Sequence, residues 1–187
     1  VYVQGGHLHV LDVATTTSRK VPARIPSDDW RLQERWINPS EYVHFVDVAA
    51  DGKSVVVGAR GDVFHLALAD KETLPRNLTG TPGVREDTPR LPPDGKQVAF
   101  VSARPPGDPD RTGNTDVFVV EARAGAEPRR LTTWAGGDNS RGSSPLAWSP
   151  DGRLIAYLQN DETRFYAYNQ ETLAVVPAAG GEARLLA

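Results

Sequence analysis

The segment from Ser143 to Leu158 reads SSPLAWSPDGRLIAYL, and its pattern recurs along the rest of the chain. It predicts a hairpin, with a short apolar run over Leu146 to Trp148, a tight turn at Pro150-Asp151-Gly152 and a second apolar run over Leu154 to Leu158. Proline presets φ, and glycine supplies the left-handed conformation that such a turn needs. Because a lone hairpin cannot bury its own apolar face, the segment needs neighbouring strands.

Those neighbours are indicated by a repeat. Four segments share a basic residue followed one or two places later by an aliphatic one, and their arginines lie 57, 53 and 55 residues apart. An apolar strand precedes each segment, and an Asp-Gly hairpin precedes the last three of these strands. The basic segments are Arg19-Lys20-Val21, Arg76-Asn77-Leu78, Arg129-Arg130-Leu131 and Arg184-Leu185-Leu186; the strands are His7 to Val13, Asp62 to Leu68, Asp116 to Ala122 and Thr172 to Pro177; the turns are Asp51-Gly52, Asp94-Gly95 and Asp151-Gly152.

Each unit of the repeat is therefore expected to contain four antiparallel strands. The hairpin strands are Val43 to Val48 with Lys53 to Gly58, Pro89 to Leu91 with Gln97 to Ser102, and Leu146 to Trp148 with Leu154 to Leu158. The first unit lacks its innermost strand, because Val1 to Gln4 already occupies the place of a second strand.

Four-stranded units at a regular spacing are typical of an all-β fold, the β-propeller. The chain is expected to be one propeller segment of about four blades, the first incomplete, at approximately 1–25, 43–79, 88–132 and 145–187. Inserted loops over Pro26 to Tyr42, Arg104 to Thr115, Ala135 to Ser144 and Gln159 to Glu171 lengthen the period. The alternative is a generic β-sandwich, which would not need the same strand order in every unit.

The Trp148–Tyr157 hairpin, together with Arg-Arg-Leu-Thr at 129–132, resembles propellers of the TolB, tricorn-protease and prolyl-oligopeptidase type. Residues 1 to about 90 resemble the N-terminal propeller of tricorn protease, and residues from about 91 resemble the propeller of an acylaminoacyl-peptidase of the prolyl oligopeptidase family. The first resemblance is carried by Gly6 to Asp12, Arg60 to Phe64 and Arg76 to Glu86, and the second by Asp94 to Ser102 and Ala147 to Leu158.

The two resemblances meet at an irregular hairpin. Leu91-Pro92-Pro93 precedes Asp94-Gly95 where these families have Trp-Ser-Pro, which suggests a chimera of two propeller fragments joined near 89–93. The resemblance implies an accessory domain that filters peptide substrates, because the catalytic Ser, Asp and His of these families lie outside the propeller.

The composition of the chain argues against several classes of function. A net charge of −3 argues against a general nucleic-acid binder, and no apolar run is long enough for a membrane helix. The absence of cysteine excludes disulfides and thiolate metal sites and fits a reducing compartment, so a natural protein of this kind is expected in the cytoplasm. A chain without methionine that begins in a strand at Val1 suggests an excised or engineered piece, or numbering trimmed after a tag.

No catalytic, cofactor-binding or metal-binding residues are predicted, and the chain is not expected to be an enzyme. It contains no Gly-x-Ser-x-Gly elbow, and Ser143 and Ser144 are the nearest resemblance to one. Four further groups have a functional interpretation, but a structural one is favoured for each: His7 and His9 as half of a metal site, the Asp108 to Asp116 loop as a calcium site, Asn77 as a glycosylation acceptor, and Trp30 and Trp36 as partner contacts. His44 and His65 are interpreted as ordinary strand residues, and Trp134 and Trp148 as packing groups.

Fewer than four complete blades do not close comfortably into a ring, since natural rings have about 4–8 blades. We expect a homodimer that completes a ring of about eight blades, with a fourfold ring in a single chain as the alternative. The expected function is a non-catalytic scaffold, either excised or engineered. The alternative is an accessory propeller that gates or binds peptides in its central channel beside a serine peptidase domain.

Overall fold

The computed structural model describes residues 1–23, 36–68, 74–104, 113–139, 145–161 and 170–186. The chain divides into two compact units, Val1–Ile37 and Asn38–Ala187. Each unit is described by itself.

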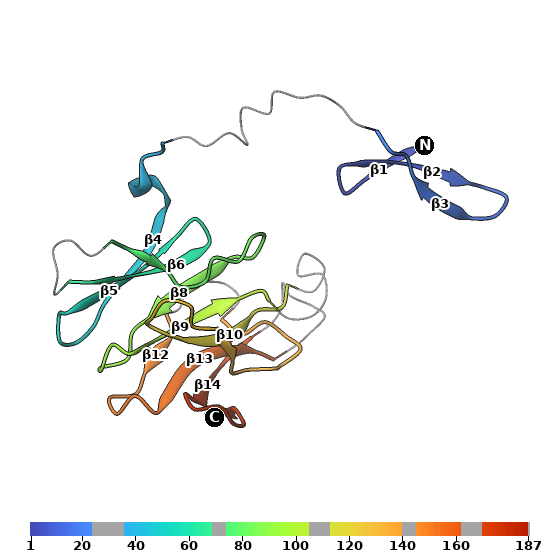
Figure 1. Cartoon of the computed structure of the whole chain (residues 1–187). Coiled ribbons are helices and arrows are strands. Elements are labelled where there is room, and N and C mark those ends of the chain that lie inside the picture. Colours follow the sequence, from blue (N-terminus) through green and yellow to red (C-terminus); the bar gives the residue numbers. More distant parts are fainter. Residues whose placement is uncertain (24–35, 69–73, 105–112, 140–144, 162–169, 187) are drawn as a thin grey trace. The chain divides into compact units, whose positions relative to one another are not determined.

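The first unit contains one antiparallel sheet of three strands, in the order β1 (Tyr2–Gln4), β2 (His7–Asp12) and β3 (Thr17–Lys20). Gly5 and Gly6, both at positive φ, turn the chain between β1 and β2. The sheet lacks a fourth strand among the described residues, as expected for the incomplete first blade (Figure 1).

The second unit contains three antiparallel sheets of four strands each, preceded by a short 3₁₀ turn, η1 (Pro39–Tyr42). The strands of each sheet follow one another along the chain and in space, which confirms the predicted meander and the all-β fold class. The second sheet consists of β4 (Val43–Val48), β5 (Ser54–Ala59), β6 (Asp62–Ala67) and β7 (Arg76–Asn77); the third of β8 (Glu86–Arg90), β9 (Gln97–Ser102), β10 (Asp116–Glu121) and β11 (Arg129–Arg130); the fourth of β12 (Ala147–Trp148), β13 (Leu154–Asn160), β14 (Glu171–Pro177) and β15 (Arg184–Leu185).

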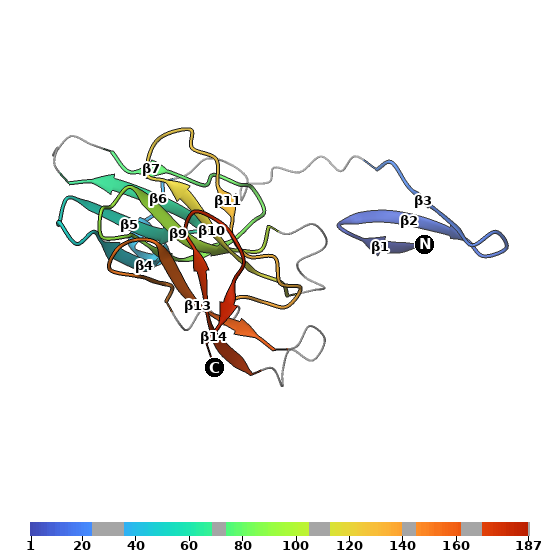
Figure 2. The ribbon, with the colours of Figure 1, turned by 90° about the horizontal axis from the view of Figure 1, so that it is seen from below.

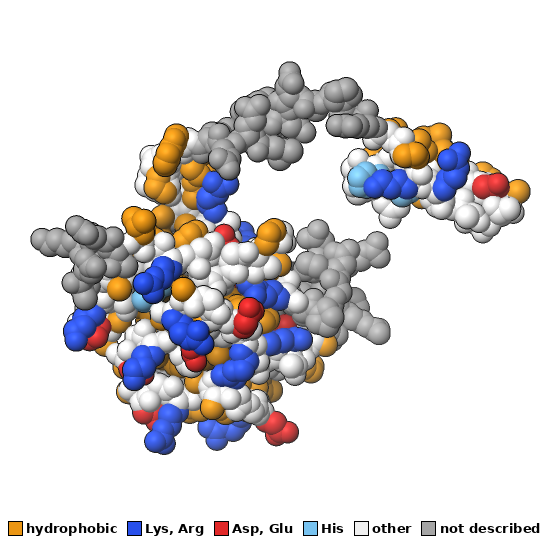
Figure 3. Space-filling model, viewed as in Figure 1, with side chains coloured by type: hydrophobic (Ala, Val, Ile, Leu, Met, Phe, Trp, Pro, Cys, Tyr) orange, Lys and Arg blue, Asp and Glu red, His pale blue; other side chains and the backbone are white. Residues whose placement is uncertain are grey.

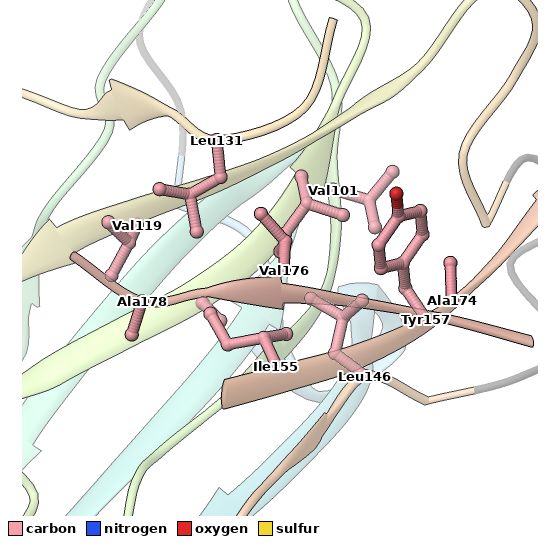
Figure 4. Close-up of a cluster of buried hydrophobic side chains, with 11 residues drawn as sticks. Val101, Val119, Leu131, Leu146, Ile155, Tyr157, Ala174, Val176 and Ala178 are labelled. Carbon is pink, nitrogen blue, oxygen red and sulfur yellow. The ribbon is translucent and has the colours of Figure 1, made fainter. Parts of the chain in front are cut away.

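The third sheet lies between the second and the fourth and is buried on both faces (Figures 1 and 2). Side chains of a strand alternate between the two faces of its sheet. Accordingly, Val98 and Phe100 pack toward the second sheet, whereas Ala99 and Val101 pack toward the fourth. Figure 4 shows the second of these cores, in which Val101, Val119 and Leu131 meet Leu146, Ile155, Tyr157 and Val176.

The face of a sheet toward the preceding sheet is called its leading face here, and the face toward the following sheet its trailing face. Each core inside the second unit joins the trailing face of one sheet to the leading face of the next. This is how neighbouring blades of a propeller pack, and the described part of the unit holds two such contacts.

The Asp-Gly turns have the same local geometry in all three sheets. Gly52, Gly95 and Gly152 have φ values of 67°, 64° and 68°, in the left-handed region that favours glycine. In each turn the aspartate side chain accepts a hydrogen bond from the backbone N–H two residues later, as in Asp94 and Lys96 at 3.1 Å. The turn residues predicted from the sequence therefore act through the expected chemistry.

Candidate functional site

The three Asp-Gly turns line one hollow of about 880 Å³ in the second unit. It is open to solvent and carries charges of both signs. Figure 3 shows basic and acidic side chains interspersed over the face of this unit that it views. Its lining includes Asp51, Lys53, His65, Asp94, Lys96 and Asp151.

The charges at the turns are locally balanced. Lys53 lies 4.0 Å from Asp51, Lys96 lies 3.7 Å from Asp94, and Arg153 lies 3.8 Å from Asp151. Hydrogen bonds from Ser149 and from the backbone of Arg153 lower the pKa of Asp151. The hollow therefore presents no concentration of one charge that would select a strongly ionic ligand.

His65 is the buried titratable group of this hollow. Burial lowers its pKa, and the positive charge of Arg76 adds to the effect, so its imidazole is neutral near pH 7. His65 lies on β6 opposite Val56 on the trailing face of the second sheet, where the third sheet has Val119 opposite Ala99. Its position is that of a packing residue within the repeat.

A second polar group lies at the start of β10. Asp116 is fully buried and pairs with Arg130 at 2.8 Å, and the Thr132 hydroxyl accepts a hydrogen bond of 2.9 Å from the backbone N–H of Val117. Burial, opposed by Arg130 and Thr132, raises the pKa of Asp116. These contacts connect the start of β10 to the segment that follows β11, the last strand of the same sheet. The pairing of the strand-opening aspartate with this threonine is called the Asp–Thr tie.

Asp138 adjoins this group and is also fully buried. Burial is the main cause that raises its pKa to about 7; the Asp116 carboxylate adds to the rise, while Thr132 and Arg130 oppose it. Its backbone N–H donates to the carbonyl of Thr115 at 2.8 Å, and the Thr115 hydroxyl donates to the carbonyl of Asp138 at 2.8 Å. A buried carboxyl group that keeps its proton near neutral pH is a candidate for function or for pH-dependent stability.

The second sheet repeats the same tie. The hydroxyl of Thr79 accepts a hydrogen bond of 3.0 Å from the backbone N–H of Val63 and donates one of 3.3 Å to Asp62. Asn77 donates a further hydrogen bond of 3.0 Å to Asp62. Because Asp62 and Thr79 hold the places of Asp116 and Thr132, the arrangement belongs to the repeat rather than to one site.

Glu86 and Arg104 form a buried ion pair next to this second tie. Their closest approach is 2.8 Å, Glu86 is 2% exposed, and Arg104 also donates to the hydroxyl of Thr81 at 2.6 Å. The guanidinium lies 5.8 Å from the ring centres of Phe100 and Phe118. Burial raises the pKa of Glu86, and the hydrogen bond and charge of Arg104 oppose the rise.

The other histidines singled out in the sequence are His7, His9 and His44. His7 and His9 lie on β2, where His9 stacks on Tyr2 with 5.3 Å between ring centres. His44 is an exposed residue of β4. Among the residues that the structure describes, no three His, Cys, Asp or Glu side chains group as metal ligands would.

Several other candidates fall outside the described residues: Trp30, Ser143 and Ser144, and the Asp108 to Thr112 part of the acidic loop. Trp36 is described and is fully exposed. Trp134 donates to the carbonyl of Asn160 at 2.9 Å, and Trp148 donates to the carbonyl of Arg90 at 3.0 Å. Asn77 accepts hydrogen bonds from the backbone N–H groups of Thr79 and Gly80 as well as contacting Asp62.

The sequence contains a periodic signal for the repeated Asp–Thr tie. Threonine follows the aliphatic residue of the basic segment in Leu78-Thr79 and Leu131-Thr132, and aspartate opens the preceding strand in both units. Glu86, Arg104 and Asp138 carry no such periodic signal. In the described ranges, no helix is long and apolar enough to cross a membrane.

No family model and no curated protein matches this chain. Among solved structures, it is similar to tricorn protease, with 15% sequence identity and a TM-score of 0.51 over 91% of this chain, and to a puromycin-hydrolyzing peptidase of Mycobacterium tuberculosis, with 14% identity and a TM-score of 0.51 over 78%. The chain spans only 15% and 23% of those two proteins. At such identities the similarity concerns the fold alone, and with the four antiparallel sheets it shows that the chain has a β-propeller-type fold.

Proposed function

We propose that this chain is a non-catalytic β-propeller scaffold that completes its stack of blades by self-association. The observation that carries the proposal is the repeated tie of Asp62 with Thr79 and of Asp116 with Thr132. A catalytic constellation is built once, with one acid, base or nucleophile in a particular place. Polar groups that recur at the same position of the second and third sheets, half-buried at Asp62 and Thr79 and buried at Asp116 and Thr132, are instead expected to support the folding of those two sheets.

Self-association is supported by the outer faces of the second unit. Val46 and Val48 on β4 are 54% and 53% exposed, and Leu173 on β14 is 45% exposed. Apolar side chains left exposed on both outer sheets of a stack fit burial against further sheets. Light scattering coupled to size-exclusion chromatography tests this part of the proposal, with a dimer as the expected species and a monomer at all concentrations as the contrary result.

The absence of catalysis is tested with a fluorophosphonate probe and a panel of fluorogenic peptides. The expected result is neither saturable labelling nor turnover above the rate of heat-unfolded protein. Saturable labelling of one serine, abolished by Ser→Ala at that position, would overturn the proposal. Because Ser143 and Ser144 lie next to each other, each is substituted separately.

A second candidate function is an accessory propeller domain that binds or gates peptides beside a peptidase domain. It is favoured by the names of the two structural neighbours, both peptidases, and by the small share of each that this chain spans. The hollow of about 880 Å³ offers a place for a short peptide. Fluorescence anisotropy with labelled peptides of four to twelve residues tests this candidate, and saturable binding that Lys96→Glu weakens would favour it over the scaffold alone.

We also propose that the chain joins two propeller segments of different ancestry near 89–93. The pairing of β8 with β9 is irregular just before this point, between Asp87 and Arg90, and Thr88 has a φ of 49° although it is not glycine. An imperfect join would account for both features. Separate alignment of residues 1–90 and 91–187 with natural propellers tests the idea, and one natural protein that matches both halves end to end would refute it.

A further inference from the structure

The three sheets of the second unit share one register, which follows from their turns. The third residue after the turn glycine is Val55, Val98 or Ile155, and it opens the leading face of β5, β9 or β13. Cross-strand pairing extends this face to β6, β10 and β14 in the same way. The equivalent leading-face sets are Val55, Val57, Phe64 and Leu66 in the second sheet, Val98, Phe100, Phe118 and Val120 in the third, and Ile155, Tyr157, Ala174 and Val176 in the fourth.

The trailing faces are equivalent by the same rule. The residues that alternate with the leading-face residues along each strand belong to the trailing face. Among them, Gly58 pairs with Val63, Val101 with Val117, and Leu158 with Leu173. The backbone N–H of Leu78, Leu131 and Leu186 donates to the carbonyl of Val63, Val117 and Leu173 respectively, each at 2.8 Å. The fourth sheet therefore presents Ala156, Leu158, Leu173, Val175 and Leu186 where the third sheet presents Ala99, Val101, Val117, Val119 and Leu131.

Two faces of the second unit remain after its internal contacts are made: the leading face of the second sheet and the trailing face of the fourth. Each is apolar, and each is the register equivalent of a face that is buried inside the unit. On the leading face of the second sheet, Val46 pairs with Val57 and holds the position that Leu146 holds in the fourth sheet, but Val46 is exposed. On the trailing face of the fourth sheet, Leu173 holds the position that Val117 holds in the third sheet, and Leu173 is also exposed. Leu146 and Val117 belong to the same buried core.

We propose that the trailing face of the fourth sheet binds the leading face of the second sheet of another copy of this chain, head to tail. A second copy fits this place because the new contact would repeat the trailing-to-leading packing found twice inside the unit. The first sheet of the same chain, which precedes the second sheet in the sequence, is the competing occupant of the leading face, and a chain that stays monomeric in light scattering would favour it and overturn the proposal. A head-to-tail contact between unlike faces closes into a ring when the rotation allows and otherwise propagates. The inference rests on the proposed self-association and specifies its faces and polarity.

The first test uses charge substitutions in the full chain. Leu173→Asp disrupts the trailing face and Val46→Asp the leading face. Leu74→Asp is the matched control, because Leu74 is 79% exposed and lies outside the strands that form the two faces. Circular dichroism and thermal unfolding first establish that each variant is folded. Each face variant is expected to shift from dimer to monomer in light scattering, and the control to remain dimeric.

Mixing distinguishes head-to-tail packing from a symmetric contact. An equimolar mixture of Leu173→Asp and Val46→Asp chains keeps one intact trailing face and one intact leading face, so a heterodimer is expected. A contact between two trailing faces would instead leave Val46→Asp dimeric by itself, and mixing would restore nothing. That result would overturn the proposal.

Cross-linking gives an independent readout because the chain has no cysteine of its own. Leu173→Cys and Val46→Cys chains are mixed and treated with a short bismaleimide. The expected product is a mixed dimer, with at least tenfold more of it than of Leu173–Leu173 product. A product linked predominantly between two positions 173 would overturn the head-to-tail inference but not the proposed scaffold function. Serine labelling by the fluorophosphonate probe would overturn the proposed scaffold function but not the head-to-tail contact.

Discussion

The indole N–H of Trp148 donates a hydrogen bond of 3.0 Å to the backbone carbonyl of Arg90, which joins the first strand of the fourth sheet to the first strand of the third. A matching bond of 2.8 Å runs from the backbone N–H of Leu91 to Asp47 on the first strand of the second sheet. Neighbouring sheets are therefore held together by directional bonds as well as by apolar packing. Such bonds fix how one blade is oriented on the next.

Replacing Trp148 by phenylalanine is expected to lower the free energy of unfolding by about 1–3 kcal/mol. The variant loses the donor and part of the aromatic surface that packs on the core between the third and fourth sheets. Urea unfolding followed by far-ultraviolet circular dichroism measures the change. Trp36→Phe is the control, because Trp36 is fully exposed and its replacement should leave the midpoint unchanged.

Thr132→Val is expected to destabilise the chain by about 1–3 kcal/mol, because valine has the shape of threonine but leaves the buried N–H of Val117 without its acceptor. Thr79→Val should act in the same direction through Val63. Thr132→Ser keeps the hydroxyl and should retain more of the stability than Thr132→Val. Equal unfolding midpoints for Thr132→Val and the unchanged chain would show that the repeated tie does not support the blade.

The fold could be predicted because its signals are local and periodic. Each Asp-Gly turn sets its own hairpin, and the unbroken apolar run from Val98 to Val101 indicates a strand buried on both faces. The prediction was wrong about where β8 begins, placing its start at Pro89 whereas the strand runs from Glu86 to Arg90. A register shift between Asp87 and Arg90 lets the chain pair on both sides of the irregularity, and Pro89, which has no backbone N–H to donate, is a local signal of such a shift.

The buried polar groups could be predicted only where they repeat. Asp116 and Thr132 recur as Asp62 and Thr79, so spacing alone relates them. Glu86, by contrast, meets Arg104 across 18 residues, and Asp138 reaches Asp116 only because the chain after β11 returns to the start of β10. Such proximity depends on the tertiary packing of particular loops, which no pattern in one sequence encodes.

The ion pair of Glu86 with Arg104 should contribute far more than that of Asp87 with Arg85, although both have an atom pair 2.8 Å apart. Removing Arg104 leaves a fully buried carboxylate side chain without its cation, whereas Arg85 is largely exposed. Arg104→Ala is therefore expected to cost about 3–5 kcal/mol and Arg85→Ala at most about 1 kcal/mol. Chemical unfolding of both variants at one pH measures the difference; equal losses would contradict the assigned role of burial.

Asp138 should make the chain less stable as the pH rises. Its pKa in the folded chain is about 7, whereas an unfolded aspartate titrates near 4. Between these values the folded state holds a proton that the unfolded state has released, so the free energy of unfolding falls with increasing pH, on the order of a few kcal/mol in all. Asp138→Asn keeps the side-chain shape but cannot ionise, and unfolding experiments from pH 5 to 8 should give it a flatter profile. Asp116 and Glu86, whose pKa values burial also raises, leave a residual slope of the same sign in the variant. Parallel profiles for the two chains would mean that the Asp138 carboxyl does not titrate in this window.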